Sequence, residues 1–104
     1  MKSCVEKWLK EQMPGMDEGT LGEIYAEYGA TARKLLEELQ AKSAAGEPFA
    51  VVDKVAHTLK GNALMVGDNA LFEVVQAWRA ALKDADAAKC GELMPEIVRM
   101  VGEI

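Results

Sequence analysis

The sequence has 104 residues, of which 50% are hydrophobic and 28% charged, and this is enough for one domain with one core. We expect a single domain over residues 1–104, which excludes a two-domain enzyme and an extended disordered tail. The formal net charge of −5 opposes binding to nucleic acid and to anionic membranes. Aromatic residues make up only 6%, and the abundance of Ala, Leu, Glu, Lys and Met favours helices over sheets.

The distribution of apolar residues indicates where the protein resides. The longest apolar runs, such as Phe49–Val52 and Ala63–Val66, are far shorter than the roughly 20 residues that cross a bilayer. The first residues carry charges every few positions and lack the apolar stretch of a secretory signal. We therefore expect a cytoplasmic protein. In that reducing compartment, Cys4 and Cys90 are expected to remain free thiols.

Proline and glycine divide the chain into five helical segments. The first two segments begin with a capping box, in which Ser or Thr is followed three residues later by Glu. They are Ser3 to about Met13, where Ser3 precedes Glu6, and Thr20 to about Ala45, where Thr20 precedes Glu23. Both segments end at glycine-containing turns, the first at Pro14–Gly15 and the second at Gly46.

The last three segments carry their own start and stop signals. Pro48 fits the first turn of a third helix that ends before Gly67. Its expected buried face is Phe49, Val52, Ala56, Leu59, Ala63 and Val66. Asp68 or Asn69 can cap a fourth helix to about Ala85, and Asp86 can cap a fifth. The expected periodic apolar residues of that fifth helix are Cys90, Met94, Ile97, Val98 and Val101, with Pro95 bending it near Gly91.

Four long amphipathic helices with short connections bury their apolar faces most simply as an antiparallel bundle. We therefore predict an all-α fold: an antiparallel up-down four-helix bundle with a short additional N-terminal helix that covers one end. The bundle core is expected over about residues 20–104, with Trp78 inside it. Because this architecture serves many functions, the function must be inferred from particular residues.

The only histidine, His57, excludes several kinds of site. A zinc site would have to combine His57 with two remote cysteines and carboxylates, without a pair of ligands at i and i+4, and a diiron site needs two Glu-x-x-His pairs. No resident metal or cofactor is therefore expected. The centre of the predicted buried face lies roughly 130° from His57 around the helix, so the imidazole is expected to point outward.

Several residues share the helix face of His57. Lys60 brings a positive charge close to anything attached to the imidazole, and Gly61 leaves space beside it. Glycine inside a helix costs about 1 kcal/mol relative to alanine, which suggests the close approach of another molecule. The remaining residues of this face are Ala50, Asp53, Lys54 and Leu64.

An exposed imidazole is largely unprotonated at neutral pH, and its free ring nitrogen can accept a phosphoryl group. The segment around it also resembles a known motif. Ala56-His57-Thr58-Leu59-Lys60-Gly61-Asn62-Ala63, followed by Gly67 and Leu71, resembles the His-x-x-Lys-Gly-x-Ala-x-x-x-Gly-x-x-x-Leu pattern of histidine phosphotransfer (HPt) domains. The resemblance covers about four fifths of the chain, from Thr20 onward.

The resemblance implies a phosphoryl carrier in a phosphorelay. His57 would exchange a phosphoryl group with the aspartate of a response-regulator receiver domain, and a sensor or hybrid histidine kinase would be the other partner. Lys60 would stabilise the phosphate and Gly61 would give the partner access. Mg²⁺ is expected in the acidic pocket of the receiver domain, and the carrier is expected to be a monomer.

We expect partners to dock over Ala50, Lys54, Gly61 and Leu64. Arg79 departs from the family pattern, which often has Leu-Glu where this chain has Trp78-Arg79. An antiparallel pair of helices that turns at Gly67 places Arg79 roughly level with His57. Two roles remain open for Arg79: a second cation near the phosphate, or an ion pair with an acidic neighbour.

Two other classes of function compete with the carrier. A non-catalytic adaptor could bind a receiver or kinase through the same bundle and keep the histidine without using it. An enzyme with its own active site has little support, because the sequence contains no nucleotide-binding loop and no recognisable pair of nucleophile and base. Phosphorylation of this chain by a phosphorylated receiver would distinguish a carrier from an adaptor.

Overall fold

The computed structural model describes residues 1–104 and contains five helices and no strands. The helices are α1 (Ser3–Gln12), α2 (Glu18–Ala44), α3 (Phe49–Leu64), α4 (Asn69–Lys83) and α5 (Ala87–Gly102). These bounds follow the five segments predicted from the sequence closely. None of the helices combines the length and the apolar character that crossing a bilayer requires.

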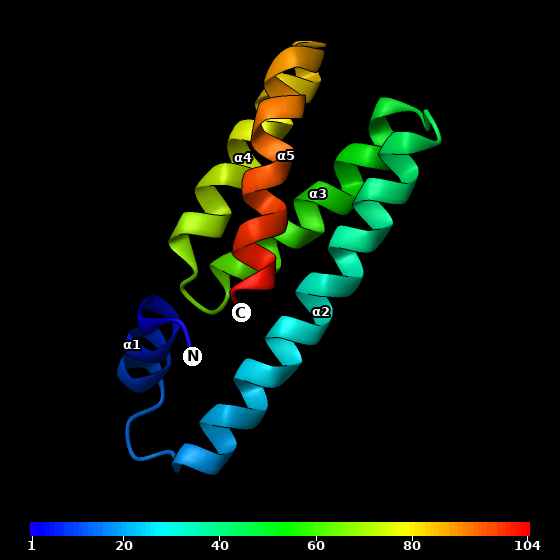
Figure 1. The fold of residues 1–104 in the computed structure, drawn as a ribbon. Helices are drawn as coiled ribbons and strands as arrows, with labels where there is room; N and C mark the ends of the chain where they lie inside the picture. Colours follow the sequence, from blue (N-terminus) through cyan, green and yellow to red (C-terminus); the bar gives the residue numbers. More distant parts are fainter.

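Helices α2 to α5 form the predicted antiparallel up-down bundle (Figure 1). Each helix packs against the next, and α5 returns beside α2 to close the ring. Helix α2 has 27 residues, and its N-terminal half extends beyond the other three helices. Helix α1 lies beside this extension, next to the turn between α3 and α4. The predicted all-α fold with a short N-terminal helix is therefore confirmed.

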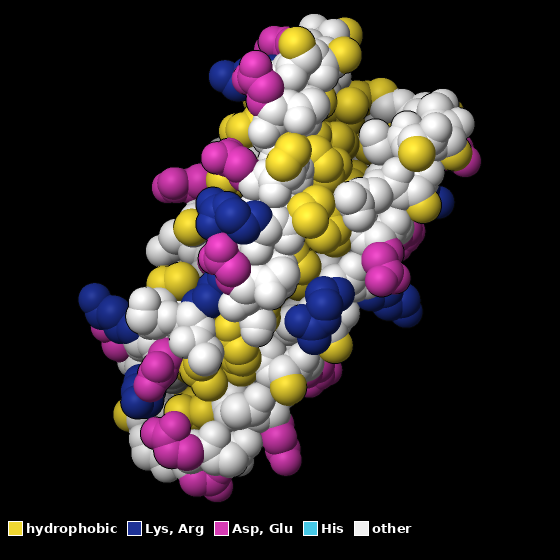
Figure 2. Space-filling view, viewed as in Figure 1, with side chains coloured by type: hydrophobic (Ala, Val, Ile, Leu, Met, Phe, Trp, Pro, Cys, Tyr) yellow, Lys and Arg dark blue, Asp and Glu magenta, His cyan; other side chains and the backbone are white.

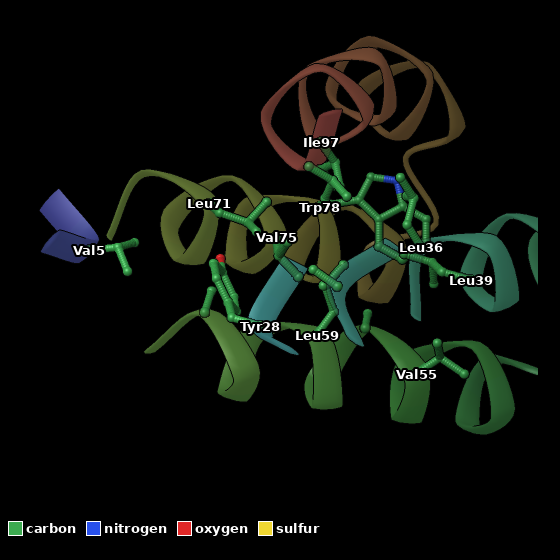
Figure 3. Packing of buried hydrophobic residues seen from close by; sticks show 14 of the residues in the cluster. Val5, Tyr28, Leu36, Leu39, Val55, Leu59, Leu71, Val75, Trp78 and Ile97 are labelled. Atoms are coloured by element: carbon green, nitrogen blue, oxygen red, sulfur yellow. The ribbon is translucent and has the colours of Figure 1, made fainter. Parts of the chain in front are cut away.

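The core is a cluster of 17 buried hydrophobic residues to which all five helices contribute. Trp78 is its largest fully enclosed side chain, with 2% of its surface exposed, as the sequence predicted. Figure 3 shows Trp78 between Ile97 of α5 and Leu36 of α2. Because burying one such side chain contributes about 1.5–3 kcal/mol, the contacts around Trp78 hold α2, α4 and α5 together.

Two residues assigned to the apolar faces are exposed. Phe49 is 48% exposed and Val98 is 40% exposed. Phe49 is the first residue of α3 and lines an open hollow between α3 and α4. Val55, which the sequence analysis left out, is buried on α3. On α5 the buried positions are Ile97 and Val101, so Val98 lies at the side of the helix.

Both predicted capping boxes are absent. Helix α1 begins one residue earlier than a Ser3 cap would require, with Lys2 at the N-cap position and no side-chain hydrogen bond there. Helix α2 begins before Thr20, because the Asp17 carboxylate accepts a hydrogen bond of 2.6 Å from the backbone N–H of Thr20. An aspartate three residues upstream therefore replaces Thr20 as the cap, and this hydrogen bond lowers the pKa of the Asp17 carboxyl.

Pro48 is the N-cap residue of α3 and not part of its first turn, whereas the predicted caps of α4 and α5 are confirmed. Asp68 caps α4 through the N–H of Leu71, and Asp86 caps α5 through the N–H of Lys89. Helix α5 runs through Pro95 as one uninterrupted element. Proline lacks the N–H that would bond to the carbonyl of Gly91, but Gly91 is exposed, so water can satisfy that carbonyl.

The Asp68 side chain does more than cap a helix. It is fully buried, yet it accepts a hydrogen bond of 2.6 Å from the Tyr28 hydroxyl and forms an ion pair of 2.9 Å with the Lys2 ammonium. Burial is the main cause that raises the pKa of the Tyr28 hydroxyl, followed by its hydrogen bond to Asp68. Asp68 therefore links the chain before α1 to α2 and to the start of α4.

The turn before Asp68 requires glycine. Gly67 has a φ of +72°, a conformation that other residues adopt only with strain. A Cβ atom at this position would lie 2.5 Å from the Cβ atom of Trp8 on α1. Gly67 therefore allows α1 to pack directly against the turn between α3 and α4.

The buried N-cap Asp68 and the exposed N-cap Asp86 give a matched test of the Asp68 network. Asp68→Ala should lower the free energy of unfolding by about 3–5 kcal/mol, because it leaves Lys2 and Tyr28 without their partner. Asp86→Ala removes only an exposed cap and should lower it by about 1 kcal/mol. Urea denaturation followed by circular dichroism measures both values. Equal losses in the two variants would show that the buried network adds nothing to stability.

Candidate functional site

His57 lies in the middle of α3 and its side chain is exposed, as its helical position predicts. The buried residues of α3 lie on the other side of the helix and are Val52, Val55, Ala56, Leu59 and Ala63. No hydrogen bond or ion pair joins the His57 ring to another residue of the chain. Both ring nitrogens are therefore open to an incoming molecule.

Arg79 forms an ion pair with an acidic neighbour, which is one of the two roles that the sequence left open. Its Nε and Nη2 atoms donate to the two carboxylate oxygens of Asp53 at 2.8 and 3.0 Å. The hydrogen bond from Arg79 lowers the pKa of the Asp53 carboxyl, and the hydrogen bond to Asp53 raises the pKa of Arg79. Because Asp53 lies one turn before His57, the guanidinium is neutralised beside the histidine rather than free.

Lys60 makes a different contact with α4. Its ammonium lies 5.7 Å from the centre of the Phe72 ring, a cation–π contact. Lys60 forms no ion pair, and neither does Lys54 on the other side of His57. The charges of both lysines are therefore available to a negatively charged group on His57.

The two contacts between α3 and α4 lie on opposite sides of His57 along α3. Asp53 with Arg79 is about one turn before the histidine, and Lys60 with Phe72 is about one turn after it. Together they fix the part of α3 that carries His57 against α4. Phe72 could not be predicted as a partner from the sequence, because this contact depends on how far α4 is displaced along α3.

The surface beside His57 is open and partly apolar. A Cβ atom added to Gly61 would meet nothing within 4 Å, so packing does not require glycine there. Leu64 is 51% exposed, as its position predicted. Ala50 is exposed one turn before Lys54. Met65, the C-cap residue of α3, is 73% exposed and was not predicted as part of this surface.

The chemistry available at this site is that of an unengaged imidazole near two unpaired ammonium groups. Such a nitrogen is a nucleophile, and the lysines favour a group that brings negative charge. No cluster of three or more His, Cys, Asp or Glu side chains is arranged to hold a metal ion. The site as built by this chain therefore suits covalent transfer of an anionic group.

Comparison with known proteins adds a family match. The family model described as the Hpt domain matches residues 23–104, which covers α2 from its second turn to the end of the chain. No curated protein and no solved structure matches the sequence significantly. The matched range contains His57 and both contacts that fix it, whereas α1 lies outside it.

The Asp53–Arg79 pair should contribute measurably to stability. A double-mutant cycle with Asp53→Ala and Arg79→Ala should give a coupling free energy of about 1 kcal/mol at pH 7, since the pair is partly shielded and bidentate. The exposed Arg99–Glu103 pair should give less than about 0.5 kcal/mol.

The pH dependence follows from the lowered pKa of Asp53. Coupling should be complete above the unfolded-state value of about 4 and should disappear as pH falls through the lower folded-state value. Thermal denaturation of the four proteins between pH 2 and pH 7 measures the profile. Coupling that grows as the pH falls would contradict the assigned ion pair.

Proposed function

The chain belongs to the Hpt domain family, and on that basis we propose that His57 carries a phosphoryl group between two-component signalling proteins. Hpt domains are phosphoryl carriers of phosphorelays that lack kinase activity of their own, and their partners include receiver domains and histidine kinases. The specific proposal is that this chain accepts the group on His57 and exchanges it with the aspartate of a response-regulator receiver domain. A sensor or hybrid histidine kinase would be the other partner.

The observation that carries this proposal is the exposed, unbonded imidazole of His57 between two unpaired lysines. In the proposed step, the lone pair of one ring nitrogen attacks the phosphorus of an aspartyl phosphate. A nitrogen–phosphorus bond forms while the phosphorus–oxygen bond to the aspartate breaks, and the bonding electrons leave with the carboxylate. The other ring nitrogen keeps its hydrogen during this step.

Lys60 is the residue that we propose stabilises the phosphoryl group. The contact with Phe72 holds its ammonium near α4 without neutralising it. Arg79 is a weaker candidate for this role, because Asp53 already engages its guanidinium. Gly61 leaves the approach to the imidazole free of side-chain atoms.

We propose that the receiver docks over Ala50, Lys54, Gly61 and Leu64, with exposed Met65 extending the same surface. An acidic receiver pocket is attracted by the unpaired Lys54 and Lys60, although the whole chain carries −5. Mg²⁺ required for the transfer is proposed to bind in that acidic pocket of the partner. The carrier is proposed to act as a monomer in the cytoplasm.

The decisive experiment uses His57→Gln. Incubation with a phosphorylated receiver should give acid-labile phosphate on the unaltered chain and none on the variant. The variant should stay folded, because an exposed substitution usually shifts stability by less than about 0.5 kcal/mol. Binding of a receiver without any acid-labile phosphate on the unaltered chain would favour the adaptor instead.

Lys60 can be tested against Arg79. Lys60→Ala should slow phosphoryl transfer about tenfold or more, since a charged hydrogen bond to phosphate is worth about 1.5–3 kcal/mol. Arg79→Ala should have a smaller effect, and Lys60→Arg should restore part of the rate. Rapid-quench measurement of transfer in both directions provides the rates. A larger effect at Arg79 than at Lys60 would reverse the proposed roles.

The docking surface can be tested with two exposed apolar residues. Leu64→Glu should weaken receiver binding about tenfold, because it places a carboxylate opposite an acidic pocket. Val98→Glu on α5 is the matched control and should leave the affinity unchanged. Gly61→Trp should block approach to His57 while circular dichroism remains normal. If calorimetry gives the affinity of the unaltered chain for both folded Leu64→Glu and folded Gly61→Trp, the docking surface lies elsewhere.

A further inference from the structure

An apolar pocket lies at the end of the bundle where α4 turns into α5. Its walls come from the C-terminal end of α2, from α4 and from the first turns of α5, and no residue of α3 contributes. Figure 2 shows hydrophobic side chains along the hollow between α5 and α2, on a face where no histidine is visible. The pocket is therefore separate from the His57 surface. Its lining includes Ser43, Trp78, Leu82, Asp86, Cys90 and Met94.

Trp78 brings an unused hydrogen-bond donor to this pocket. Its side chain is only 2% exposed, and its Nε1 atom has no hydrogen-bond partner. Figure 3 shows the indole nitrogen on the edge of the ring that faces α5. Buried donors are normally satisfied, because an unpaired one loses the hydrogen bond that water provides in the unfolded chain. An acceptor placed against Trp78 would therefore be bound favourably.

The neighbouring polar groups do not supply that acceptor. The Cys90 thiol donates to the backbone carbonyl of Trp78 at 3.9 Å, and burial raises the pKa of this thiol, which favours its neutral form. The Asp86 carboxylate already accepts from the N–H of Lys89. Asp86 is also the only charged residue of the lining, so its charge disfavours an anionic ligand. The apolar walls disfavour a strongly hydrated one.

We propose that this pocket binds a small, neutral, mainly apolar molecule that carries one hydrogen-bond acceptor, which takes the Trp78 Nε1–H. A few placed polar groups within apolar walls are typical of small-molecule sites. Met94 lines the pocket with Trp78 and is only partly buried, and because methionine side chains adapt readily, we expect the lining to adjust until the acceptor reaches the buried indole N–H. A peptide segment is disfavoured because its N–H groups would find few free acceptors on these walls.

The test compares two molecules of the same shape. Acetophenone has a carbonyl oxygen where α-methylstyrene has a methylene group, so only acetophenone can accept the indole hydrogen bond. In ¹H–¹⁵N spectra of the full chain, acetophenone should move the Trp78 indole signal downfield, while the signal of Trp8 stays in place. It should bind roughly 5-fold to 10-fold more tightly than α-methylstyrene, as expected for one hydrogen bond. Equal affinities, or an unmoved Trp78 signal at millimolar acetophenone, would overturn the proposal.

Two glycine variants provide the matched control. Neither Gly91, which lines the pocket, nor Gly22 on α2 has atoms within 4 Å of an added Cβ. Gly91→Leu should abolish acetophenone binding by filling the pocket, and Gly22→Leu should leave it unchanged. His57→Gln should also bind normally, which separates this proposal from the phosphoryl carrier. A dimer of the unaltered chain that Gly91→Leu abolishes would assign the pocket to a second copy and overturn the small-molecule proposal.

Discussion

The buried carboxylate of Asp68 joins three parts of the chain at the point where α3 turns into α4. Removing a carboxylate from water is unfavourable unless charge and hydrogen bonds compensate, and Lys2, Tyr28 and the N–H of Leu71 provide them. Gly67, immediately before it, lets α1 pack against the same turn. With the turn held from three directions, the position of α4 along α3 is fixed.

That position determines the electrostatics around His57. It brings Arg79 to Asp53 and Phe72 to Lys60, so one cation is neutralised and the other remains free. A displacement of one helical turn would separate both pairs at once. The local charge near the histidine is therefore set by helix packing far from it, at the Asp68 turn, and it is positive although the chain as a whole is acidic.

Helical periodicity was sufficient to predict the bundle, the buried Trp78 and the exposure of His57 and Leu64, because these depend on angle around a single helix. It was insufficient where the outcome depends on distant parts of the chain. The Asp68–Lys2 pair joins residues 66 positions apart, and no local pattern encodes it. The predictions of N-caps at Ser3 and Thr20 were wrong. Helix α1 begins without a side-chain cap, and in α2 the Asp17 carboxylate lies upstream and accepts the capping hydrogen bond. Phe49 was wrongly predicted to be buried because it lies at a helix end, where the angular position around the helix no longer determines burial.

The residues that stabilise the fold and those that form the His57 surface are almost entirely separate. Gly67 and Asp68 are buried and constrained by their neighbours, whereas Gly61 has open space around it and Leu64 is half exposed. Packing within the chain gives no reason for a glycine at position 61 or for an exposed leucine at position 64. No packing contact within the chain therefore offsets the free-energy cost of a glycine at position 61 of this helix. In the proposed carrier, a docking receiver domain would use the open space at Gly61, which would account for a glycine beside the histidine.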